Sequence, residues 1–599
     1  MAQKNLKIHT ENILPIIKRW LYSDKDIFIR ELVSNACDAL RKLQILQSQQ
    51  LAAITEEELK IELIVNKEAR TLQFVDTGIG MTAEEVEKYI AQIAFSGAEE
   101  FLEKYQGQNE QIIGHFGLGF YSAYMVASQV TIDTLSYQPE TEPAFWSCAG
   151  SSEYTLEKGT RAKRGTTITL HLGEDSDDFL EENQLRKILE RYCLFLPYSI
   201  YLNGSRINEK DPLWLKNASD CTEQEYLDFY HTLYPLEPDP IFWIHLNVDI
   251  PFHLKGILYF PKIGRQFDWK QSNIQLFVNR VFVSDTCKDL MPDFLTCLRG
   301  AIDSPDIPLN VSRSSLQMDR TVRQLSSHIS KKVADKLASL HQLEKEKFQA
   351  AWPEIEMIVK LGILQDEKFY SRAKEFLIWK TVSGTWTTLE AASEKVFYTS
   401  DAHSPLLELY KDKEVLLSTC PIDSHLFGFL ESKLSLKFQR IDGALDNSLI
   451  DASREKDILD SDGRTESAKI ADFFRKALHS HAIEVEAKSL ASDSLPAFLI
   501  SDENIRRLRD SLAISGREIP ASFKTSKTLV VNTNNSLVSS LYRLQDTHSE
   551  LAQDVAQHLY DLSLLSQKEI DPSAMAQFMK RSTDVLGKLL NLSTHLPNS

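Results

Sequence analysis

The residues with the clearest capacity for chemistry lie close together near the start of the chain. A stretch without Gly or Pro opens at Ser23, which forms a capping-box pattern with Asp26 and so predicts a helix. Glu31 and Asn35 are one helical turn apart in it, and Asp38 lies a further turn along. Residues at i and i+4 share a helix face, so carboxylate and carboxamide groups are presented together. Taken alone, this pattern is also that of the polar edge of an ordinary core helix. An apolar stripe accompanies it: Leu32, Val33, Ala36 and Leu40.

A second candidate group follows a predicted β-hairpin. Two alternating apolar segments, 61–65 and 72–75, are separated by turn residues and end at Asp76. Gly78 and Gly80 come directly after it and would let a ligand approach the backbone closely. A carboxylate only accepts hydrogen bonds, so Asp76 is suited to the exocyclic amine of an adenine. Thr82 and Glu85 then form a capping-box pattern for a helix through about residue 93.

A glycine-rich segment supplies the third group. Gly114, Gly117 and Gly119 precede an apolar helix expected to begin near Phe120, and free amides at a helix start suit a phosphate. A lone G-x-x-G-x-G pattern is usually a tight turn. Here it follows an E-x-x-x-N helix and a D-x-G-x-G strand end, in that order and within the length of one domain. The combination of the three motifs, with groups suited to an adenine and to a phosphate, is a much more specific signal than any one of them.

Composition narrows the class of protein. With 599 residues the chain is expected to form about three or four domains. Its hydrophobic content of 43% and charged content of 25% are those of a globular protein. We expect no signal peptide or membrane span, and seven cysteines without C-x-x-C spacing fit a reducing cytoplasm better than disulfides or zinc. A net charge of −18 argues against a nucleic-acid partner.

These motifs resemble a known family. IFIRELVSNACDAL, VDTGIGM and IGHFGLGFYSAYMVA are similar to the ATP-binding fold that gyrase, heat-shock chaperone, histidine kinase and MutL-type proteins share, and most closely to bacterial members of the heat shock protein 90 family of chaperones. The acidic charge disfavours the gyrase and MutL branches. A sensor kinase would need a dimerising helix with a phospho-accepting histidine upstream, and Glu31 lies too near the N-terminus for one.

The resemblance implies roles for individual residues, with ATP and magnesium as ligands. Glu31 would be the general base, and Arg313 of PLNVSR would reach the γ-phosphate with Gln317 beside it. Asn35 would supply an oxygen to magnesium, and Thr166 would reach the adenine through water. The predicted cofactor-binding residues are Asn35, Asp38, Asp76, Ile79, Gly80, Met81, Gly114, Gly117, Leu118, Gly119, Phe120 and Thr166.

The predicted fold is multidomain α/β. Residues 1–208 would form an α/β sandwich, one helical layer on a mostly antiparallel sheet, with a lid at about 91–119. A polar connector, 209–241, would lead to an α/β middle domain, 242–480, that carries the catalytic arginine and a client surface. Strands are expected in KGILYFP and IQLFVNRVFVSD, and a helical series runs from Leu316 to Leu337. Residues 481–599 would form a small, mostly helical domain.

The end of the chain has an apolar stripe. Helices are expected over 542–565 and 574–590, and the second carries Met575, Phe578, Met579, Leu586, Leu589 and Leu590 on one side. Such a stripe is either core or a partner surface. The resemblance implies a four-helix interface of a homodimer, which opens and closes as it slowly hydrolyses ATP and remodels non-native clients, with other chaperones as further candidate partners. The given sequence ends in HLPNS, so we expect no EEVD-type tail.

Two positions depart from the family pattern. Phe95 stands where a lid lysine usually helps hold a phosphate, and Ser314 follows Arg313 where relatives often have glutamate. We expect the ATPase to survive, because neither change touches Glu31, Asn35 or Asp76. The alternative is an ATP-binding holdase or scaffold whose hydrolysis is vestigial.

Overall fold

The computed structural model divides the chain into two compact units, residues 1–336 and 337–599. It describes residues 24–54, 56–93, 95–97, 101, 113–114, 117–151, 153–262, 273–285, 290–307, 309–310, 320–390, 392, 394–451, 453, 465–478, 483–503, 505–507, 512 and 527–594. Within these residues no helix is long and apolar enough to cross a bilayer.

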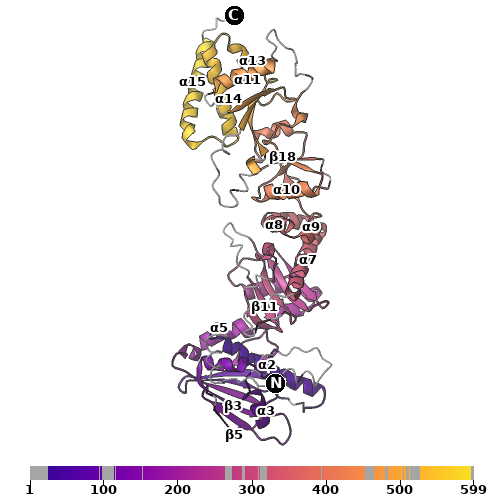
Figure 1. Ribbon diagram of the computed structural model, residues 1–599, viewed down its shortest axis with the longest axis vertical. Helices are drawn as coiled ribbons and strands as arrows, with labels where there is room; N and C mark the ends of the chain where they lie inside the picture. Colours follow the sequence, from indigo (N-terminus) through magenta and orange to yellow (C-terminus); the bar gives the residue numbers. More distant parts are fainter. Residues whose placement is uncertain are drawn as a thin grey trace, which may run out of the picture. The chain divides into compact units, whose positions relative to one another are not determined.

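An eight-stranded sheet forms the base of the first unit, in the order β5-β4-β3-β6-β2-β1-β7-β8 (Figure 1). Every neighbouring pair is antiparallel except β1 and β7. The strands are β1 (Lys60–Asn66), β2 (Thr71–Asp76), β3 (Ala127–Leu135), β4 (Ala144–Cys148), β5 (Tyr154–Lys158), β6 (Gly165–Leu172), β7 (Ser199–Leu202) and β8 (Ser205–Arg206). The predicted hairpin and the mostly antiparallel sheet are therefore confirmed.

Helices α2 (Ile27–Ser48) and α5 (Glu182–Cys193) pack against each other, and α2 also packs on the central strands β1 and β2. The predicted stripe of α2 is buried, and it meets apolar side chains of the hairpin such as Leu63 and Phe74. The start of α2 differs from the expectation. Asp26 is its N-cap and has no side-chain capping bond, while Ser23 lies outside the described residues. Tyr192 of α5 instead donates a hydrogen bond to Asp26 at 3.4 Å.

Two short helices border the sheet. Helix α3 (Ala83–Tyr89) begins with the predicted capping box of Thr82 and Glu85. It ends earlier than expected, because the amide of Ala91 bonds to the carbonyl of Val86 and closes a wider turn. The segment after the glycines was expected to be an α-helix but is a 3-10 helix, η3 (Gly119–Met125). Strand β3 begins two residues later, which leaves no length for a regular α-helix.

The first unit also contains a second, five-stranded sheet. Its order is β12-β11-β13-β10-β9, with β9 (Phe242–Val248), β10 (Leu254–Phe260), β11 (Asn273–Val278), β12 (Val281–Ser284) and β13 (Arg299–Asp303). The expected strands of this region are confirmed. The expected polar connector does more than link the sheets: it forms α6 (Glu223–Leu233) and buries Trp214, Phe229 and Tyr230 in a core that both sheets share. Helix α7 (Arg320–Leu343) then carries the predicted apolar series from Val322 to Leu337, and the boundary between the units falls within it.

The second unit contains two further sheets. One has the order β15-β14-β17-β16-β18 and the other β19-β21-β20. The strands are β14 (Trp379–Thr381), β15 (Trp386–Thr387), β16 (Lys395–Thr399), β17 (Val415–Leu417), β18 (Lys437–Arg440), β19 (Glu484–Lys488), β20 (Ala497–Ser501) and β21 (Lys527–Asn532). The helices are α8 (Lys345–Gln365), α9 (Glu367–Ala373), α10 (Asp423–Lys433), α11 (Glu466–Ala477), α13 (Ser536–Leu544), α14 (Ser549–Ser566) and α15 (Met575–Thr594).

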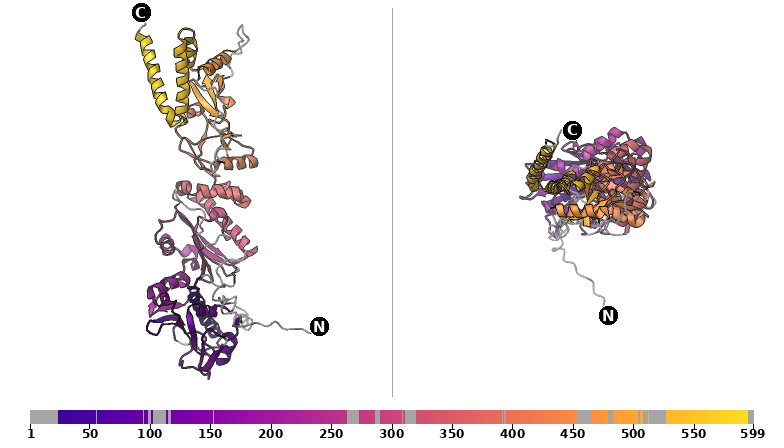
Figure 2. Two further views of the ribbon diagram at one scale, coloured as in Figure 1. Left: turned by 60° about the vertical axis from the view of Figure 1, so that its left-hand side comes forward. Right: turned by 90° about the horizontal axis from the view of Figure 1, so that it is seen from above.

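Helices α14 and α15 lie side by side as a hairpin, which can be seen in Figure 1 and in the left view of Figure 2. The single helix expected over 542–565 is in fact two helices. A turn at 545–548 separates them, because the amides of Thr547 and His548 both bond to the carbonyl of Leu544. On α15 the predicted apolar stripe is divided. Phe578 is buried, whereas Met579, Leu586, Leu589 and Leu590 are 58%, 59%, 43% and 66% exposed.

Candidate functional site: the cavity beside helix α2

Glu31 is held in one orientation by its neighbour in the chain. Nε and Nη2 of Arg30 donate to Oε1 of Glu31 at 3.1 and 2.9 Å, and both side chains are almost fully buried. The other carboxylate oxygen, Oε2, faces the glycine segment: a Cβ added to Gly119 would come within 2.6 Å of it. Glycine at 119 therefore keeps space open directly in front of one oxygen of a buried, oriented carboxylate.

Asn35 and Asp38 face a neighbouring part of the glycine segment. The carboxylate of Asp38 accepts two backbone hydrogen bonds, from Ile113 to Oδ1 and from Gly114 to Oδ2, each at 2.7 Å. Oδ1 of Asn35 lies 3.3 Å from the position that a Cβ of Gly114 would take. Asp38 thus fixes the backbone at Gly114, while the amide oxygen of Asn35 is presented beside it.

Asp76 is placed by the end of β2. Its Oδ1 accepts the amide of Gly78 at 2.8 Å, and Thr166 of β6 is its direct partner across the strands. Burial raises the pKa of Asp76 to about 6, although the Gly78 amide and the charge of Arg161 act against this rise. The hydroxyl of Thr166 shares a hydrogen bond with Thr134 at 3.0 Å. A buried acceptor and a hydroxyl therefore lie next to each other where β2 ends and β6 begins.

The two predicted glycines after Asp76 are required by close backbone contacts. Gly80 has φ +65°, and a Cβ there would lie 1.8 Å from the carbonyl oxygen of Leu135. At Gly78 a Cβ would come within 2.7 Å of Ala39 on α2. The turn after β2 consequently packs tightly between the helix and strand β3, which sets the position of Asp76.

These groups border one cavity of about 350 Å³. The predicted residues that line it are Glu31, Asn35, Asp38, Asp76, Ile79, Gly80, Met81, Gly114, Gly117, Gly119, Phe120 and Thr166. Leu118 does not line it but packs against the core. Arg313 and Gln317 lie outside the described residues, as does most of the expected lid. Because η3 is a 3-10 helix of seven residues, individual backbone amides, rather than the start of an α-helix, are the groups that could meet a phosphate.

Sequence reasoning missed several residues of the cavity wall. Lys42, Glu85, Tyr89 and Tyr137 also line it. A signal for Lys42 was present, because it lies one turn beyond Asp38 on the face that carries Glu31 and Asn35. Glu85 was assigned only a capping role, which it does have. Tyr137 follows β3 and reaches the cavity only through the tertiary fold.

Two family models match the chain, one over the region of this cavity and one over most of the remaining residues. A model described as histidine kinase-, DNA gyrase B- and HSP90-like ATPase matches residues 24–165, and one described as Hsp90 protein matches residues 203–598. The chain belongs to the Hsp90 family. It is an ATP-dependent molecular chaperone, and its first domain is a nucleotide-binding ATPase domain.

Individual relatives agree with this assignment. The chain is 39% identical over 576 residues to the chaperone protein HtpG of Porphyromonas gingivalis, covering 90% of this chain and 84% of the relative. It is 38% identical over 593 residues to HtpG of Bacteroides fragilis, covering 93% and 86%. A more distant HtpG, from Geobacter metallireducens, is 30% identical over 627 residues, covering 94% and 95%. The similarity thus extends through both units of this Hsp90-family chain.

Proposed function

We propose that the cavity beside α2 binds Mg·ATP, that Glu31 and Arg313 hydrolyse it, and that a homodimer uses this slow reaction to remodel non-native client proteins in the cytoplasm. The observation that carries the proposal is the cavity itself. Oriented Glu31, accessible Asn35 and buried Asp76 come from two separate segments and face a single space.

The adenine would bind at the Asp76 end of the cavity. The ionised carboxylate accepts a hydrogen bond from the exocyclic amine, and Thr166 offers a hydroxyl beside it. Met81 and Phe120 provide apolar walls for the ring. The backbone amides of residues 117–120 would meet the phosphates, beside the space that Gly119 leaves open next to Glu31.

The groups that face the phosphates fit a magnesium ion. Asn35 presents a neutral amide oxygen beside Gly114, where a larger residue would intrude, and such an oxygen is a ligand that Mg²⁺ accepts. When bound, the ion offsets the charge of the phosphates. Asn35 would hold it with one oxygen and leave the remaining positions to phosphate and water.

Glu31 would act as the general base. One of its oxygens is fixed by Arg30, so the other, which faces Gly119, is the one positioned to accept a proton from an attacking water. Arg313 would stabilise the charge that develops on the γ-phosphoryl group, with Gln317 beside it. The chain that leads toward Arg313 supports this role: Ile307 and Leu309 line a cavity of about 120 Å³ together with Arg30.

The exposed side of α15 fits the surface of a homodimer. Met579, Leu586, Leu589 and Leu590 are exposed on one side of the helix, while Phe578 and Val585 on the other side are buried. A second copy of the same helix hairpin would cover them by two-fold symmetry. Changing Leu586 and Leu590 to Glu should leave the buried side intact and shift the protein toward monomer in sedimentation; a variant that stays dimeric would locate the interface elsewhere.

The hydrolysis proposal is tested by steady-state turnover of the full chain beside Glu31→Ala and Arg313→Ala, with ATP affinity measured for all three. We expect slow turnover in the parent and a loss of about 10²-fold or more in both variants, with ATP binding retained. Glu87→Ala, an exposed change on α3, is the matched control. If the parent binds ATP but turns over no faster than the variants, the holdase alternative replaces the proposal.

A further inference from the structure

A second cavity in the first unit, of about 430 Å³, takes no part in the proposed ATP chemistry. Its walls come from three places that are distant in the sequence: the end of α2 with the residues that follow it, the end of β3, and the two residues before β6. Tyr137 lines both this cavity and the nucleotide cavity. Its volume is within the range of pockets that bind small molecules, about 300–1,000 Å³. The fold thus creates a second candidate binding site next to the first.

The charged residues that line the second cavity are Lys163, Arg164 and Glu57. Arg164 donates from Nη2 to Oε2 of Glu57 at 3.2 Å, and only 12% of its side chain is exposed. Its Nε is buried and has no hydrogen-bond partner among the described residues. Because a buried donor without an acceptor costs free energy, this guanidinium can gain from a bound acceptor.

Lys163 adds a second positive charge to the same lining. It is exposed, and its ammonium group forms no ion pair with the residues that the structure describes. Glu57 is the one carboxylate that lines the cavity, so two cations and one anion leave a net charge of +1. The charged part of the lining is therefore suited to a single negative charge.

The rest of the cavity is mainly apolar. Ser136 and Tyr137 are its other polar residues, and the apolar ones are Leu43, Ala52, Ala53 and Leu135. Leu51 and Ile54 flank the two alanines in the chain and are 57% and 81% exposed. Apolar side chains that gather around a cavity indicate a ligand with an apolar body.

We propose that the second cavity binds a small organic monoanion that has an apolar body and a carboxylate head. The carboxylate pairs with Lys163 and with the guanidinium of Arg164, whose planar set of donors matches two carboxylate oxygens. A single negative charge neutralises the lining, whereas a phosphate dianion would exceed its net charge. The apolar body lies against Leu43 and Leu135. This inference does not depend on the proposed ATP hydrolysis.

The test is calorimetric titration of the full chain with 2-naphthoate in the presence of saturating Mg·ADP, which occupies the nucleotide cavity. The comparison ligand is 2-naphthamide, which has the same shape without the charge. It should bind about tenfold more weakly or less, because it lacks a charge-assisted hydrogen bond. Naphthoate binding that disappears when ADP is added would place the probe in the nucleotide cavity and overturn the inference.

Two substitutions assign the binding to the proposed cations. Lys163→Met should weaken naphthoate binding by about twofold to fivefold, since this lysine is exposed, and should leave naphthamide binding unchanged. Arg164→Lys retains the charge beside Glu57 but removes the planar set of donors, and should weaken naphthoate binding by about tenfold. Lys187→Met, an exposed change on α5, is the matched control and should alter neither affinity.

The thermal unfolding midpoint and ADP affinity of each variant show whether its fold is retained. Equal affinity of the parent for the acid and the amide, or naphthoate binding unaffected by both Lys163→Met and Arg164→Lys, would overturn the inference. A parent protein that does not bind ADP would contradict the proposed nucleotide site alone. The two cation variants, titrated without nucleotide, would still decide whether the second cavity binds the carboxylate.

Discussion

Two carboxylates, Asp76 in the first unit and the partly buried Glu503 in the second, have opposite shifts of their pKa. In the first unit, burial raises the pKa of Asp76 to about 6, and the carboxylate lines an open cavity. In the second, Glu503 is also enclosed, but hydrogen bonds and charge from Arg506 outweigh the effect of burial, and its pKa is lowered. Burial disfavours the charged form of the carboxylate that lines the cavity, whereas neighbouring donors and cations stabilise the charged form of the carboxylate that is part of an ion-pair network.

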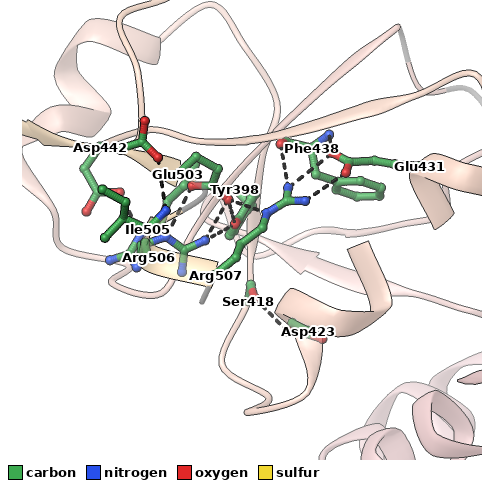
Figure 3. Close-up of polar contacts among 12 residues, drawn as sticks. Tyr398, Ser418, Asp423, Glu431, Phe438, Asp442, Glu503, Ile505, Arg506 and Arg507 are labelled. Atoms are coloured by element: carbon green, nitrogen blue, oxygen red, sulfur yellow. Dashed lines mark hydrogen bonds and ion pairs between the residues drawn. The ribbon is translucent and has the colours of Figure 1, made fainter. Parts of the chain in front are cut away.

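Figure 3 shows the hydrogen bonds and ion pairs around Glu503 in the second unit. Arg507 donates from Nη1 to Glu431 and from Nε to Glu503, each at 2.8 Å, and from Nη2 to the carbonyl of Phe438 at 3.0 Å. Tyr398 donates to Glu503 at 2.7 Å. The network joins strands β16 and β18 and helix α10 to the segment after β20. Its donors and acceptors face one another, so we assign it to stability rather than to ligand binding.

Lys360 forms a deeply buried ion pair in the second unit, and its substitution should have the largest effect on the free energy of unfolding. Its Nζ lies 2.6 Å from Asp423 and 2.8 Å from Glu356, and both Lys360 and Asp423 are almost inaccessible. Lys360→Met should lower the free energy of unfolding by about 3–5 kcal/mol, because Asp423 is left as an uncompensated buried charge. Denaturant titration measures this. Adding Asp423→Asn should recover part of the loss; no recovery would mean that the charge is not the cause.

Asp76→Asn should weaken ligand binding without lowering the stability of the protein, which is the opposite of what we expect for Lys360→Met. The new amide can offer a donor to the donor of adenine, so adenosine and ATP affinity should fall by about tenfold to a hundredfold or more in calorimetry. Because burial raises the pKa of Asp76, its charge opposes folding above pH 6, and the variant should be as stable as the parent at pH 8 or more stable by up to about 3 kcal/mol. Unchanged ATP affinity would remove Asp76 from the adenine role.

Arg507→Ala should destabilise the second unit by about 1–3 kcal/mol, since Glu431 and Glu503 lose charged hydrogen bonds. ATP affinity should not change. Lys433→Ala provides the comparison within the same unit, because its ion pair with Glu367 is largely exposed and should contribute less than about 1 kcal/mol. Equal effects of the two substitutions would show that the network adds nothing beyond surface pairing.

The pH dependence of adenosine binding is the mildest test. A carboxyl group with a raised pKa loses its acceptor capacity as pH falls through about 6, so affinity should be constant above pH 7 and should decline about tenfold per pH unit well below 6. Titrations at pH 5 to 8 on the parent and on Asp76→Asn measure it, and the variant should lack this dependence. A flat profile for the parent would place the relevant ionisation elsewhere.

Local sequence patterns were enough to predict the features whose residues lie close together in the sequence. The i, i+4 spacing of Glu31 and Asn35, the hairpin that ends at Asp76 and the capping box at Thr82 all describe neighbours within a turn or a strand, and the structure places them as expected. The type and the ends of some helices could not be predicted from the sequence. The 3-10 helix after Leu118 and the break after Leu544 depend on how much space the surrounding elements leave.

By itself, the sequence determined the order of the motifs and the types of residue at the cavity beside α2, because these follow from local spacing, and the resemblance of the motifs to known proteins indicated the family. Only the tertiary structure decided which charges are matched. It brought Ile113 and Gly114 onto Asp38, left Lys42 as the one cation of the described cavity lining and exposed one side of α15 while burying the other. Burial and charge pairing depend on residues distant in the chain, and no local period encodes them.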